Sequence, residues 1–172
     1  MKNNTLIFVA IILAMFANSC TSNSDSKEQS VSIGFAKGAK ISSSGLKTVN
    51  DGLTFKESYF IADGVKTESN EVQIGQKVAI VFEGIEGFKE KSGKVFPALS
   101  ILVLDAKNQV VVTYDNLLKS ETGYDVKDAT MLTGSLTIGE PLKHGESYTL
   151  TVTVGDKESA NGIVGNITLK IK

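Results

Sequence analysis

The chain has 172 residues and a formal net charge of −1 at pH 7, with 18 basic residues, all of them lysine, against 19 acidic ones. This balance produces no field that would attract nucleic acid, and the lack of arginine removes the bidentate group that best recognises phosphate. One histidine and one cysteine exclude zinc or copper sites built from these residues. Because tryptophan is absent, a sugar-stacking platform would have to use Tyr59, Tyr114, Tyr124 or Tyr148.

The first twenty residues have the pattern of an export signal. Lys2 supplies a positive charge, residues 6–16 form an uninterrupted apolar stretch, and small residues stand directly before Cys20. An apolar stretch of this length cannot span a bilayer, which takes about 20 residues. The pattern therefore predicts secretion, with residues 1–19 removed as a signal peptide.

The sequence Ala17-Asn18-Ser19-Cys20 resembles the bacterial lipobox. The resemblance implies that Cys20 is acylated and becomes the first residue of the mature chain, so that its lipid anchors the protein in the cell envelope. Thr21, where other lipoproteins have Asp, resembles the pattern of Gram-negative lipoproteins that are sent to the outer membrane. The alternative is an ordinary secretory signal cleaved near Ala17, which would leave a free thiol on an exported protein.

The mature chain is expected to contain a tether and one domain. Residues 20–30 are polar after the cysteine and predict a flexible tether, and residues 31–172 are long enough to bury a core. Within residues 31–69 two segments have strand-like composition and Asp63-Gly64 predicts a turn. We expect this part to add strands or a hairpin to the domain. The alternative is a small separate subdomain. The two strand-like segments are residues 31–35 and 53–61.

From residue 76 onward, apolar and polar residues alternate with the period of two that is typical of half-buried strands. Clusters of Gly, Asn and Asp separate these segments and predict turns. Two segments, 77–82 and 99–104, are apolar almost without a break and are expected to be the most deeply buried. The predicted fold class is all-β, an antiparallel β-sandwich. Its strands are expected near 76–83, 98–104, 109–114, 131–138, 147–154 and 163–171.

Two features resemble immunoglobulin-like domains. Residues 70–78 look like the entry to the early strands of bacterial Ig-like modules, and Tyr148 follows the turn His144-Gly145 as a Tyr does in the tyrosine corner. The resemblance implies an Ig-like sandwich in which the Tyr148 hydroxyl bonds to upstream backbone. It identifies an architecture and does not identify a functional family.

In this strand order the three longest loops, 84–97, 115–130 and 155–162, emerge at one end of the sandwich, where we expect a binding surface first. Their aromatic and acidic side chains would anchor a peptide, a glycan or a neighbouring subunit, or hold a calcium ion. In the competing interpretation the rings cap the core and the charges only solvate the loops. The candidate residues are Glu86, Phe88, Phe96, Asp115, Tyr124, Asp125, Asp128, Asp156 and Glu158.

Together these features predict a lipid-anchored envelope protein with a non-catalytic binding or adhesion role, a protein or glycan partner and no required cofactor. One alternative is a structural accessory of an envelope complex, which would show an exposed apolar patch on a sheet face or edge. Another is a carboxylate-based hydrolase, which would place two carboxylates in one pocket. A serine hydrolase is not expected, because His144 lies in a turn at the other end and no Gly-x-Ser-x-Gly elbow accompanies it.

Overall fold

The computed structural model describes residues 38–172, which lie in a single compact unit. The export signal, Cys20, the tether and the strand-like segment 31–35 lie outside the described residues. Among the residues described, no helix is long and apolar enough to cross a membrane. The described elements are β1 (Lys40–Ile41), β2 (Lys47–Asp51), β3 (Glu57–Ala62), β4 (Val65–Lys66), β5 (Glu71–Val72), β6 (Lys77–Glu83), β7 (Pro97–Leu104), β8 (Val110–Tyr114), a 3-10 helix η1 (Val126–Ala129), β9 (Met131–Thr137), β10 (Ser147–Asp156) and β11 (Gly162–Ile171).

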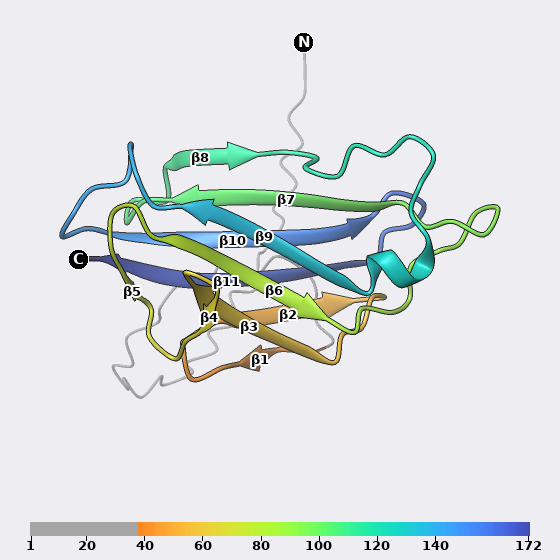
Figure 1. The fold of residues 1–172 in the computed structure, drawn as a ribbon, viewed down its shortest axis with the longest axis horizontal. Helices are drawn as coiled ribbons and strands as arrows, with labels where there is room; N and C mark the ends of the chain where they lie inside the picture. Colours follow the sequence, from red (N-terminus) through yellow and green to blue (C-terminus); the bar gives the residue numbers. More distant parts are fainter. Residues whose placement is uncertain (1–37) are drawn as a thin grey trace, which may run out of the picture. The chain divides into compact units, whose positions relative to one another are not determined.

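The strands form two sheets that pack face to face (Figure 1). The larger sheet has the order β1-β2-β11-β10-β7-β8, with β5 added beside the end of β11, and the smaller one has the order β4-β3-β6-β9. All neighbouring strands run antiparallel except β5, which runs parallel to β11. The predicted all-β antiparallel sandwich is therefore confirmed.

Strand β6 supplies the centre of the core because its residues are apolar on both faces. Val78, Ile80 and Phe82 are buried against the opposite sheet, and the Phe82 ring meets Phe55 edge-on with centroids 6.0 Å apart. Ala79 and Val81 fall on the outer face by the alternation of the strand and are buried there between neighbouring strands. This double burial agrees with the uninterrupted apolar run predicted at 77–82.

Strand β7 lies inside its sheet, between β10 and the edge strand β8, but its burial alternates. Leu99, Ile101 and Val103 are buried in the core. Leu102 and Leu104 face outward and are half-buried. The apolar run at 99–104 therefore overstates burial on the outer face, since an exposed sheet face tolerates single apolar side chains.

The immunoglobulin-like arrangement predicted for the six later strands is present. Strands β8, β7, β10 and β11 lie side by side in one sheet, and β6 pairs with β9 in the other. The Tyr148 hydroxyl accepts a hydrogen bond from the Lys143 N–H at 3.1 Å and donates one to Glu146 at 2.7 Å. Burial and the bond to Glu146 raise the pKa of Tyr148. The bond from the Lys143 N–H is the link to upstream backbone that a tyrosine corner requires.

The described residues before β5 add strands to both sheets instead of forming a subdomain. Strand β2 pairs with β11 in the larger sheet, and β3 pairs with β6 in the smaller one. The strand expected at 53–61 begins only at Glu57, because Leu53 and Phe55 are buried where the chain crosses between the sheets. The turn predicted at Asp63-Gly64 joins β3 to β4, with φ of 48° and 82° as a two-residue hairpin of type I′ requires.

Candidate functional site

The three long loops gather at one end of the sandwich, as the strand order predicted, and are tied together there. Backbone bonds join Val95 to Tyr124, and the Lys157 N–H donates to the Phe96 carbonyl at 2.9 Å. Two ion pairs add to these links, Lys91 with Glu158 at 3.2 Å and Lys94 with Asp125 at 2.7 Å. The loop end is therefore a braced surface rather than a set of independent loops.

Asp156 is the centre of this bracing. We expected an accessible carboxylate at the surface, but its side chain is buried. Its side chain is only 5% exposed and accepts hydrogen bonds from the Lys89 N–H at 2.9 Å and the Glu158 N–H at 3.1 Å. The Ser159 hydroxyl donates a third bond at 2.6 Å. Its carboxylate thus joins the loop after β6 to the turn between β10 and β11.

The aromatic rings predicted at this end are half-buried. Phe88 packs against the core, and Phe96 contacts the chain near Gly123, where an added Cβ would meet its Cζ at 2.9 Å. The Lys91 ammonium lies 5.9 Å from the centre of the Phe96 ring. Tyr124 is likewise half-buried. The rings thus follow the capping interpretation more closely than that of projecting anchors.

Three further carboxylates predicted for the binding surface at the loop end are exposed. Glu86 is exposed, while its backbone pairs with Thr54. Asp115 and Asp128 are exposed, and Asp128 lies in η1. Among residues 38–172, no group of three or more His, Cys, Asp or Glu side chains is placed to hold a metal ion. A binding role for the nine candidate residues stays a prediction.

A groove that was not predicted from the sequence lies elsewhere, at the edge of the smaller sheet. It has a volume of about 450 Å³ and opens between the turn of the β1–β2 hairpin and the start of β3. Strand β4 covers only the last two residues of β3, so the earlier edge of β3 stays open to this groove. We call it the Tyr59 groove; its lining is Ser42, Ser43, Ser44, Glu57, Ser58, Tyr59, Phe60, Lys66, Thr67 and Glu68.

A charged network fixes one wall of the Tyr59 groove. Lys66 forms an ion pair with Glu57, and its ammonium lies 4.7 Å from the centre of the Tyr59 ring. The Tyr59 hydroxyl donates a hydrogen bond to Glu83 at 3.4 Å. Desolvation and the negative charge of Glu83 raise the pKa of Tyr59, and the bond to Glu57 raises the pKa of Lys66. The phenol therefore stays neutral and the amine charged at physiological pH.

The opposite wall consists of hydroxyl groups. Ser42 and Ser44 share a hydrogen bond with their oxygens 2.9 Å apart, and Ser44 is buried. Ser43 beside them is exposed. Each hydroxyl can donate one hydrogen bond and accept others, so the groove offers donors and acceptors to a polar ligand along its length.

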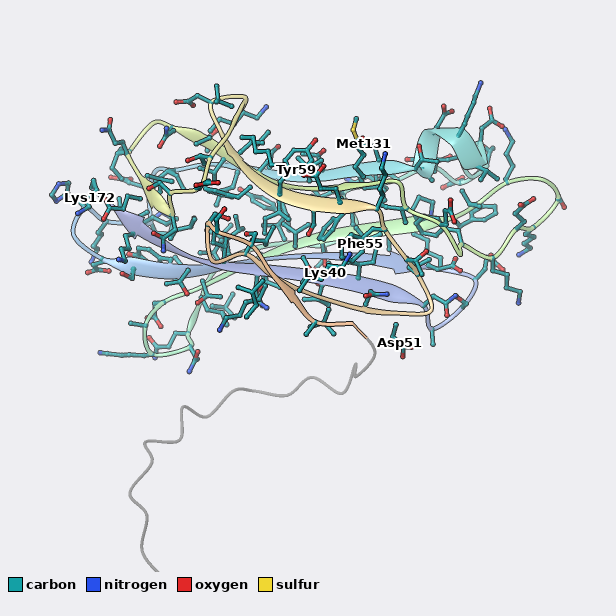
Figure 2. All side chains as sticks on the ribbon, turned by 90° about the horizontal axis from the view of Figure 1, so that it is seen from below. Lys40, Asp51, Phe55, Tyr59, Met131 and Lys172 are labelled. Atoms are coloured by element: carbon teal, nitrogen blue, oxygen red, sulfur yellow. The ribbon has the colours of Figure 1, made fainter. Side chains whose placement is uncertain are left out.

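Sequence reasoning missed this groove because its lining comes from three separate segments, 42–44, 57–60 and 66–68. Tyr59 was considered only as one of four tyrosines able to stack on a sugar. Figure 2 shows Tyr59 on the outer side of the smaller sheet and Phe55 between the two sheets. The alternation of Tyr59 with the buried Phe60 along β3 was a usable signal. The approach of residues 42–44 to Tyr59 could not be predicted, since it depends on pairing between distant strands.

Comparisons with known proteins are remote. No protein-family model matches the chain, and no curated protein matches its sequence. The C-terminal domain of wzt is similar with a TM-score of 0.49 and 10% identity, over 73% of this chain and 77% of that one. A chitin binding domain from Burkholderia pseudomallei has a TM-score of 0.39 and 13% identity, over 59% of this chain and 56% of its own. The function has to be argued from the residues of this chain.

Proposed function

We propose that this protein is a lipid-anchored, non-catalytic binding protein of the cell envelope that takes a glycan in the Tyr59 groove. The observation that supports the proposal is the composition of this groove. Five hydroxyl-bearing Ser and Thr side chains, two carboxylates, one ammonium and one phenol line it, with Phe60 as the one apolar side chain. A concave site with converging polar groups beside an aromatic ring suits a ligand rich in hydroxyl groups.

The charges in the groove favour a neutral or amino sugar over an acidic one. Glu57 and Glu68 line the groove, Glu83 lies behind the Tyr59 hydroxyl, and Lys66 is the one cation in the lining. Since Glu57 already pairs with Lys66, an acidic sugar would meet the remaining negative charge without a free cation in the lining. An amino sugar would instead gain an attraction to Glu68.

The groove is also where a carboxylate-based hydrolase would have to act, because Glu57 and Glu68 both line it. The ion pair with Lys66 gives Glu57 a structural partner and holds it beside Tyr59. We therefore assign Glu57 to positioning of the wall rather than to proton transfer. Measurement of sugar products after long incubation distinguishes the two, since a binding protein releases none.

Replacing Tyr59 by Ala is expected to weaken binding of neutral glycans by about tenfold, because an aromatic contact and the seat of Lys66 are both lost. The measurement is titration of the protein against a panel of neutral, amino and acidic bacterial glycans. The matched control is Tyr114→Ala, which removes a 48% exposed tyrosine from β8 in the other sheet. If Tyr59→Ala and Tyr114→Ala bound glycans with equal affinity, or if the natural chain preferred acidic glycans, the groove would be ruled out as the site.

Envelope attachment through Cys20 is the second part of the proposal and depends on the lipobox-like sequence before that residue. Two or more acyl chains on one cysteine anchor a protein stably, because each buried methylene contributes about 0.8 kcal/mol. Ten residues of polar tether span about 17 Å as a random coil. The groove would then work within a short distance of a membrane surface.

The Cys20→Ala chain is expected to leave the membrane fraction completely and to keep its affinity for glycan. The mass of the mature N-terminus is the direct measurement, with acyl chains expected on Cys20 of the natural chain. An unmodified thiol at Cys20, or a variant that still sediments with membranes, would contradict the anchoring. Comparison of partners crosslinked in intact envelopes by the two chains then shows which contacts need the anchor.

A further inference from the structure

The two sides of the sandwich differ in how their edge strands are protected. On the side where the described chain begins, the edges are β1 and β4, each two residues long and each carrying a lysine, Lys40 or Lys66. On the other side the edges are β8 and β9, which are five and seven residues long and carry no charged residue. Short edges and lysines prevent strands from pairing with other chains, and this protection is lacking on the second side.

Strand β9 offers a regular row of backbone groups along its open edge. The Ile138 N–H donates to the Gln76 carbonyl at 2.8 Å, and hydrogen-bonded pairs recur at every second residue of an antiparallel ladder. Leu132, Gly134 and Leu136 therefore direct their backbone groups to β6. The backbone groups that point away from β6, where the described chain supplies no further strand, belong to Met131, Thr133, Ser135 and Thr137.

The sequence of β9 is nearly symmetric about Gly134. When two copies are paired antiparallel with Gly134 opposite Gly134, Leu132 stands opposite Leu136, and Thr133 stands opposite Ser135. Like side chains then share a face, and no charged residues meet. Hydroxyl pairs and apolar pairs of this kind are favourable across antiparallel strands.

The same register covers the part of the core that is open at this edge. Leu132 and Leu136 are each 8% exposed, more than most of the core. A groove of about 340 Å³ opens beside Leu136 between the two sheets, lined also by Tyr114 and Leu117, which are 48% and 42% exposed. The register places Leu132 of the second copy opposite Leu136, on the face of the sheet where this groove opens.

We propose that the protein forms a two-fold symmetric dimer in which the β9 strands of two copies pair antiparallel about Gly134, joining the two smaller sheets into one. A two-fold axis makes the contact self-complementary and closes the assembly at two copies, because each β9 edge is used once. The Tyr59 groove and the start of the described chain lie at the opposite edges and stay free. The dimer does not rest on the proposed glycan binding.

The first test measures association of the full chain by sedimentation equilibrium in density-matched detergent over a concentration series. A monomer–dimer equilibrium is expected, and Thr133→Lys should raise the dimer dissociation constant by at least about tenfold, because a lysine on each copy would flank the paired edge. The matched control is Thr168→Lys, an exposed threonine on β11, which should leave the constant unchanged. Thermal unfolding of both variants verifies that they remain folded.

The second test fixes the register. Two tagged copies of the chain, one with Thr133→Cys and one with Ser135→Cys, are expressed together and oxidised in intact envelopes. A disulfide-linked pair of the two tags is expected, since opposed residues in a narrow antiparallel pair lie within disulfide reach. Copies that both carry Thr168→Cys should form no more disulfide than random collision produces. A monomeric natural chain, or crosslinking no stronger at 133 and 135 than at 168, would overturn the proposal.

Discussion

Replacing Phe82 by Ala is expected to lower the free energy of unfolding by about 3–5 kcal/mol. The ring is fully buried at the centre of the core, where it meets Phe55 with centroids 6.0 Å apart and an interplanar angle of 67°. It also lies against β11, since a Cβ added to Gly165 would meet the Phe82 Cζ at 2.8 Å. One side chain thus fills the space between the two sheets, and its removal leaves a cavity that neither sheet can close alone. Urea unfolding followed by tyrosine fluorescence measures the loss.

The contact between Phe82 and Gly165 can be isolated by a double-mutant cycle. Gly165→Ala alone is expected to cost about 1–3 kcal/mol through overpacking, whereas the same change in the Phe82→Ala chain should cost less, because the space has been vacated. Gly134→Ala is the matched control, because its added Cβ would meet Val152 at 2.5 Å and not Phe82. If the cost of Gly165→Ala were equal in both backgrounds, the ring would not lie over this glycine.

The later strands could be predicted because each carries its own signals. The alternation of buried and outward residues in β10 is continuous from Tyr148 to Asp156, and Tyr148 itself marks the corner that starts the strand. The hairpin at Asp63-Gly64 was likewise predictable from the two residues that need positive φ. Predictions from local patterns of this kind agree with the folded structure because packing and turn chemistry favour the same conformation.

Strand β2 shows why the rest could not be read from the sequence. Of its residues Lys47–Asp51 only Thr48 is buried, so the strand has no apolar alternation to detect. It forms because Thr48 lies opposite Gly165, a residue more than a hundred positions later in the chain. Strand formation here depends on a tertiary partner rather than on the local sequence.

The loop end separates what topology determines from what side-chain packing determines. The convergence of the three loops followed from the alternation of strand direction and is present. The inward placement of Phe96 depends on Gly123, whose φ of 78° and lack of a side chain let the chain approach the ring. Similarly, the burial of Asp156 depends on Lys89, which belongs to a loop 67 residues earlier. Such contacts between loops leave no period or spacing in the sequence.

Replacing Asp156 by Ala is expected to cost about 2–3 kcal/mol of stability, because hydrogen bonds to a buried carboxylate contribute more than neutral ones and two backbone N–H groups lose their acceptor. Those donors are Lys89 and Glu158, with Ser159 supplying the third bond. The effect should be concentrated at the loop end, since no core side chain is removed. Hydrogen exchange is expected to show faster exchange at the Lys89 and Glu158 amides, while β6 and β10 stay protected.

Two matched variants distinguish this bracing role from a general effect of charge. Asp156→Asn keeps the shape but offers one acceptor atom where the carboxylate has two, so an intermediate loss of stability is expected. Glu158→Gln removes a neighbouring charge that pairs with Lys91 at the surface and should cost no more than about 1 kcal/mol. If Asp156→Ala were as mild as Glu158→Gln, with the Lys89 amide still protected, Asp156 would not hold the loops together. The loop end would then be a set of independent segments free to rearrange around a ligand.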